Sequence, residues 1–137
     1  MATQRAQLIS THPGPFPMDE NTLIDIIDRI YECGKTCTTC ADACLGEDDP
    51  KGQAACITSC QNCGEVCITT ARALSRVTGF NPDTIRHLVE ACEQICRICA
   101  DECASHGDAM DHCRRCSQTC RDCADACRSF LQELQAA

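Results

Sequence analysis

Cysteine is the residue of this chain best suited to chemistry, and it occupies seventeen of the 137 positions. Thiolates bind soft metal ions, form disulfides and take part in redox exchange. The cysteines fall into rows with steps of three or four residues, which is the spacing of one face of an α-helix. The rows are Cys33, Cys37, Cys40 and Cys44; Cys56, Cys60, Cys63 and Cys67; Cys92, Cys96, Cys99 and Cys103; and Cys113, Cys116, Cys120, Cys123 and Cys127.

Glycine and proline residues separate the helices that carry these rows. Gly46, Gly79 and Gly107 each follow a periodic run, where a left-handed residue would cap the helix. Asn81 precedes a proline, which is typical of a helix N-terminus. The sequence therefore predicts helices near residues 19–45, 50–78, 82–105 and 109–135.

The turns between these predicted helices are short, which favours antiparallel neighbours. We therefore expect an all-α fold, an antiparallel up-down-up-down four-helix bundle with a cysteine-lined core. The bundle should span residues 19–137. Residues 1–18 contain Pro13, Pro15 and Pro17, and we expect them to form an N-terminal tail that is ordered only where it docks on the bundle.

The two ends of the predicted bundle differ. Ordinary hydrophobic residues continue the stripes at one end, and they include Ile26, Leu74, Ile85 and Phe130. The opposite end holds His106, Met110 and His112, whose side chains can bind soft metal ions. We predict that the hydrophobic end is closed and that the other end is an open mouth where these three residues join the cysteines as metal ligands.

Composition excludes several classes of function. The formal net charge is −8 and no Lys/Arg run is present, which argues against nucleic acid as a partner. No stretch reaches the roughly 18 apolar residues that a membrane span requires, and no export signal is visible. We therefore expect a cytoplasmic protein without a membrane partner, in a compartment that keeps thiols reduced. A high cysteine content in such a compartment indicates metal or redox chemistry.

Several uses of the thiols compete. Cysteine can serve as a small hydrophobic core residue, but seventeen in continuous rows exceed what that role explains. Helix-stapling disulfides fit poorly with an odd cysteine count and a reducing compartment. Zinc and iron–sulfur sites use Cys-x-x-Cys steps, but they take ligands in separate sets of four. An iron–sulfur or thiol-redox protein remains the alternative.

Charge favours copper(I). Four divalent ions on sixteen thiolates would leave about eight uncompensated negative charges in a low-dielectric core, which is costly. A soft monovalent ion loaded about one per thiolate leaves the core near neutral, and copper(I) prefers thiolate ligands. The sequence therefore predicts a store of multiple copper(I) ions, on the order of seventeen per chain. No nucleophile–base pair, carboxylate dyad or nucleotide loop is visible, so we expect no enzymatic activity.

The four cysteine rows resemble those of the bacterial copper storage proteins, a family of cysteine-rich four-helix bundles. The resemblance covers about residues 19–135. Some members are exported with a twin-arginine leader and have a methionine-rich mouth. No such leader is visible in this sequence, and His106 and His112 lie at the predicted mouth, so we expect a protein that resembles the cytosolic branch. The resemblance implies storage of many copper(I) ions per bundle and assembly as a homotetramer, and a copper chaperone is a candidate partner.

Overall fold

The computed structural model describes residues 3–136, and these residues form helices and no strand. Residues 1, 2 and 137, at the outer limits of the predicted tail and bundle, lie outside the described residues. The all-α prediction is confirmed. The elements are α1 (Gln4–Thr11), α2 (Glu20–Leu45), the 3-10 helix η1 (Pro50–Gln53), α3 (Ala54–Leu74), α4 (Pro82–Ala104) and α5 (Asp111–Ala136).

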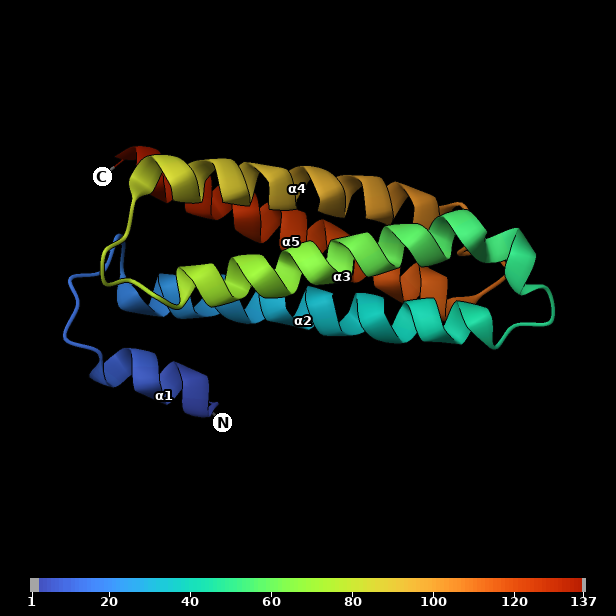
Figure 1. The fold of residues 1–137 in the computed structure, drawn as a ribbon, viewed down its shortest axis with the longest axis horizontal. Coiled ribbons are helices and arrows are strands. Elements are labelled where there is room, and N and C mark those ends of the chain that lie inside the picture. The colour runs from blue at the N-terminus through green and yellow to red at the C-terminus, as the bar shows by residue number, and fades with distance from the viewer. Residues whose placement is uncertain (1–2, 137) are drawn as a thin grey trace.

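The four long helices lie alongside one another (Figure 1). Helix α2 packs against α3 and α5, and α4 packs against the same two helices. The α2–α3 and α4–α5 connections lie at one end of the molecule, while the α3–α4 connection and the end of α5 lie at the other (Figure 1). This arrangement turns the cysteine face of each long helix toward a shared axis. Within residues 3–136, no helix has both the length and the apolar character needed to cross a bilayer.

Side-chain caps fix where two of the long helices begin. Asn81 accepts a hydrogen bond from the Thr84 backbone N–H at 2.9 Å, and Asp19 accepts one from the Thr22 N–H at 3.1 Å. Each bond satisfies an N–H group that has no partner within its helix. The predicted start at residue 50 is instead a 3-10 turn, and α3 ends at Leu74 rather than near residue 78.

The helix C-termini use glycine less often than predicted. Gly79 has a left-handed φ of 72°, as a turn between α3 and α4 requires. The expectation was wrong for Gly46, whose φ is −84°, and for Gly107, whose φ is not positive. The Gly46 N–H reaches the Asp42 and Ala43 carbonyls at 3.2 and 3.1 Å, so the chain leaves α2 through a tightened right-handed turn.

Hydrophobic side chains fill the end of the axis beside the α3–α4 connection. Phe130 is fully buried, and Ile26 and Leu74 are each 1% exposed. Ile85 is partly buried and packs against the same core. The predicted closure of this end is therefore confirmed, because large apolar side chains from the four long helices meet there.

The N-terminal segment contains structure that the sequence did not predict. Helix α1 packs against α2 (Figure 1). Ala6 and Ile9 are buried by this contact. Arg5 forms an ion pair with Asp28 and lies 4.4 Å from the centroid of the Tyr31 ring. The segment is therefore held by apolar burial together with ionic and cation–π contacts.

Helices α2 and α3 approach closely where two glycines face each other. A Cβ added at Gly34 would lie 2.6 Å from Ile68 Cδ1 and 3.3 Å from the Gly64 carbonyl oxygen. A Cβ added at Gly64 would lie 3.3 Å from the Gly34 carbonyl oxygen. Glycine at both positions therefore lets the two backbones pack at short range.

We predict that Gly34→Ala lowers the free energy of unfolding of the reduced, metal-free protein by about 1–3 kcal/mol, because the methyl group overpacks the interface. Gly46→Ala is the matched control, since a Cβ there meets its nearest atom at 3.5 Å. Adding Ile68→Val should restore part of the loss by removing Cδ1. Denaturant unfolding followed by circular dichroism measures these changes, and equal stability of the two alanine variants would contradict the account.

Candidate metal centre

The seventeen cysteines form the central part of the core. All are buried, and none takes part in a disulfide. Cys40 is 3% exposed, and every other cysteine is fully buried. These thiols therefore contact one another and the surrounding apolar side chains rather than bulk water.

Sulfur atoms from different helices lie within van der Waals or weak hydrogen-bond distance. The Cys37 and Cys120 Sγ atoms, from α2 and α5, are 3.5 Å apart. Cys96 of α4 lies 3.5 Å from Cys67 of α3 and 3.4 Å from Cys123 of α5. The prediction of a cysteine-lined core is confirmed by these contacts between rows.

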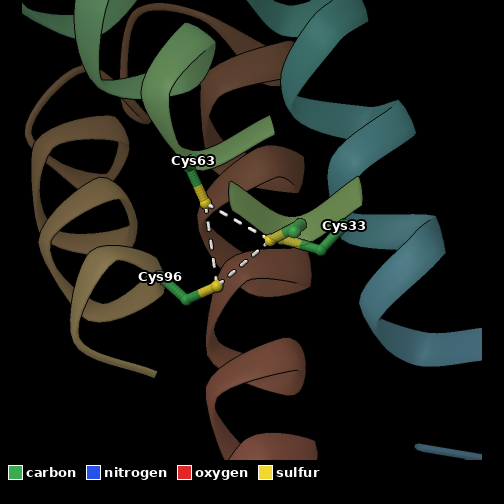
Figure 2. Close-up of side chains that lie close together, drawn as sticks. Cys33, Cys63 and Cys96 are labelled. Carbon is green, nitrogen blue, oxygen red and sulfur yellow. Dashed lines mark hydrogen bonds between the residues drawn. The ribbon is translucent and has the colours of Figure 1, made fainter. Parts of the chain in front are cut away.

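Figure 2 shows one such meeting point. The sulfurs of Cys33, Cys63 and Cys96 point toward one another from α2, α3 and α4. The Cys63 and Cys96 Sγ atoms are 3.7 Å apart. Together with Cys67 these residues form a group whose sulfurs all lie within 4.8 Å of one another. A soft ion could bind between them after small side-chain rotations.

Groups of four donors that all lie within 4.8 Å of one another recur along the axis and share members. In the order given below, the first two groups share Cys33 and Cys63. The second and third share Cys37 and Cys120, and the third and fourth share Cys116. Five of these groups are Cys33, Cys63, Cys67 and Cys96; Cys33, Cys37, Cys63 and Cys120; Cys37, Cys99, Cys116 and Cys120; Cys40, Cys60, Cys103 and Cys116; and Cys40, Cys44, His112 and Cys113. Because the groups overlap, the donors form a continuous series rather than separate sites.

Burial affects the ionisation of the thiols near the α2–α3 connection. It raises the pKa of Cys44, and repulsion from negative charge on the nearby Cys56 sulfur raises it further. Burial likewise raises the pKa of Cys113, with added repulsion from Cys56 and Cys44. Both thiols are therefore protonated at neutral pH, and a metal ion that binds them must displace their protons.

One predicted mouth residue contacts the thiols directly. His112 Nδ1 lies 3.5 Å from the Sγ atoms of both Cys40 and Cys113. Its Nε2 atom lies 2.9 Å from Glu47 Oε1, in the turn after α2. The imidazole thus directs one nitrogen toward the sulfurs and the other toward a carboxylate, as metal-binding histidines commonly do.

The other two predicted mouth residues are placed differently. Met110 is partly buried and packs against the buried core. His106 Nε2 faces the Glu102 carboxylate at 3.6 Å, one turn earlier in the chain. The structure therefore brings His112 into a four-donor group, and the ligand roles of His112, Met110 and His106 all remain predictions.

The chain is similar to known proteins in sequence and in structure. A family described as copper storage protein matches residues 19–132. The chain belongs to the copper storage protein family. The cysteine-rich protein YhjQ of Bacillus subtilis (strain 168) is 30% identical over 88 residues, which cover 64% of this chain and 76% of YhjQ.

Solved structures from the same family superpose closely. The Streptomyces lividans copper storage protein Ccsp, loaded with 10 copper equivalents, is 36% identical with a TM-score of 0.92. The match covers 96% of this chain and all of Ccsp. A cytosolic copper storage protein from the same organism, studied with five coppers, is 38% identical with a TM-score of 0.80 over 82% of this chain and 93% of that one.

Sequence reasoning missed Glu47 as part of this copper storage protein's candidate centre. Glu47 lies in a turn and carries no periodic signal. Only the fold brings it to His112, which is 65 residues away in the chain. Its hydrogen bond matters because the partner of one imidazole nitrogen determines which tautomer faces the metal ligands.

We predict that the neutral His112 side chain of the metal-free protein carries its proton on Nε2, which donates to Glu47 and leaves the Nδ1 lone pair facing the thiols. Nitrogen-15 NMR of the imidazole measures the tautomer. Glu47→Ala should yield a mixture of tautomers. Glu102→Ala, the control at the carboxylate facing His106, should leave the His112 signals unchanged, and an Nδ1-protonated His112 in the wild type would contradict this assignment.

Proposed function

We propose that this protein stores copper(I) in the thiol core, with about one ion per cysteine. The observation that carries the proposal is the continuous series of overlapping donor groups, which includes cysteines from all four rows. Copper(I) is soft and accepts few ligands, so neighbouring ions can share thiolates along such a series. The family relation supports the same function.

We further propose that α2, α3, α4 and α5 form an antiparallel up-down-up-down bundle over residues 19–137, with residues 1–18 as an N-terminal tail. The packing of α2 and α4 against both α3 and α5 supports this topology. In this proposal the bundle holds the thiols in position before any metal binds, because capped helices fix the scaffold. The protein is therefore proposed to be folded without copper.

The proposed ligands are the seventeen cysteines of the four rows, together with His112, and with Met110 and His106 beside the outer end. Charge supports monovalent ions here. Each bound copper(I) replaces one thiol proton, so the loaded core carries about the same charge as the metal-free core. Divalent ions on shared thiolates would change the net charge of the core, because the ionic charge would not equal the number of protons displaced. The overlap of the donor groups and the family relation favour copper storage over iron–sulfur or thiol-redox chemistry.

The proposed setting is the cytosol, which agrees with the description of the Streptomyces lividans relative as cytosolic.

A homotetramer is proposed from the family resemblance. A surface groove of about 760 Å³ between α2 and α3, lined in part by Leu45, Gly64 and Ile68, could provide a contact surface. Delivery by a copper chaperone is a further proposal, and catalysis is not part of the proposed role.

Titration of the reduced, metal-free protein with copper(I) under nitrogen, in competition with a chelator, should saturate on the order of seventeen ions per chain. The same titration with zinc(II) should reach a much lower capacity, because divalent ions leave excess negative charge. Saturation of copper uptake near four ions, or displacement of bound copper by zinc, would contradict storage.

Copper uptake should also release about one proton per ion near neutral pH, because raised pKa values keep thiols such as Cys44 and Cys113 protonated. Protons and copper compete for the same sulfurs, so the apparent copper affinity should fall as pH falls. A pH-indicator assay in weak buffer measures the release. A titration without proton release would show that the thiols were already ionised.

A further inference from the structure

One thiol of the core reaches the surface on the side of the molecule. Among the cysteines, all of which lie within the described residues 3–136, Cys40 alone retains exposed surface. Cys44, Cys56, Cys103 and Cys113, nearest the predicted mouth, are fully buried. The structure therefore covers the outermost thiols where the sequence predicted an opening.

A groove reaches Cys40 along the seam between α2 and α5. It encloses about 380 Å³. Its lining includes Thr36, Thr39 and Cys40 from α2, and His112 and Arg115 from α5. A volume of this size suits a small molecule rather than a protein segment. The groove thus brings a small ligand to Cys40 and His112 together.

Cys40 belongs to two donor groups at once. It joins Cys44, His112 and Cys113 in the outer group that contains the imidazole. It also joins an inner group of thiols with Cys60, Cys103 and Cys116. An ion bound at Cys40 can therefore exchange into the interior through shared ligands.

We propose that copper(I) enters from the side, through the α2–α5 groove, with Cys40 as the first thiol to bind it and a copper(I) complex of a small thiol as the donor. This inference rests on the proposed storage function. In the transfer, a copper–sulfur bond to the donor breaks and one to Cys40 forms. The Cys40 proton passes to the departing donor thiolate, and copper remains monovalent throughout.

The surface beside the groove suits a donor with carboxylate groups. The Lys35 and Arg115 side chains are 69% and 70% exposed, and they pair with Glu32 at 3.4 Å and Asp111 at 2.7 Å. Such exposed ion pairs contribute little stability and rearrange easily. These cations can therefore contact the carboxylates of a peptide thiol such as glutathione.

The first test uses no metal. The reduced, metal-free protein is treated briefly with iodoacetamide, quenched and mapped by peptide mass spectrometry. Cys40 should be alkylated first, at least about ten-fold faster than Cys44 or Cys113, because reactivity follows exposure. Earlier alkylation of Cys44 or Cys113 would overturn the side route in favour of the end, whatever the copper capacity is.

The second test fills the groove without removing a thiol. Thr39→Phe should slow copper uptake from copper(I)–glutathione about ten-fold or more in anaerobic stopped-flow experiments, while the final capacity stays at the wild-type value. Gln94→Phe, at an exposed α4 position that lines neither the α2–α5 groove nor the α2–α3 groove, is the matched control and should load at the wild-type rate. Circular dichroism checks that both variants are folded.

The outcomes separate the two proposals. Equal loading rates for the two phenylalanine variants would overturn the side route while leaving storage intact. Failure of the wild type to load from copper(I)–glutathione, together with loading from a protein donor, would overturn the small-thiol donor. A negligible capacity with every donor would instead contradict the storage function itself.

Discussion

The need to bury a row of thiols on each of four helices is the constraint on which the structure depends. Thiol–thiol contacts are weak, so the sulfurs contribute packing without a strong directional preference. The positions of the cysteines are therefore set by the helices. Caps at Asp19 and Asn81 fix where α2 and α4 begin, and the close approach at Gly34 and Gly64 fixes how α2 packs on α3. The outcome is a core in which sulfurs from all four rows lie close together.

The same core explains why copper(I) is suited to it. Sulfurs such as those of Cys96 and Cys123, 3.4 Å apart, lie too close to be ionised together without a cation between them. In the metal-free protein, protons keep these thiols neutral, and a soft monovalent ion can take the place of each proton. In this account, storage exchanges one monocation for another within the thiol core.

Much of this could be predicted from the sequence. Steps of three and four residues placed each cysteine row on one helix face, and the hydrophobic continuation through Ile26 and Phe130 identified the closed end. The sequence could not show that α1 docks through Ile9, because an eight-residue helix has little periodicity. Nor could it bring Glu47 to His112 or show that Cys40 borders a groove, since these depend on how the helices pack.

Anomalous X-ray diffraction at the copper absorption edge, from crystals of the copper-loaded protein, tests the central claim most directly. The account predicts a line of copper peaks along the bundle axis, each between sulfurs of the cysteine rows, with the outermost near Cys40 and His112. Copper confined to the surface, or to one isolated four-sulfur site with the remaining thiols unbound, would contradict it.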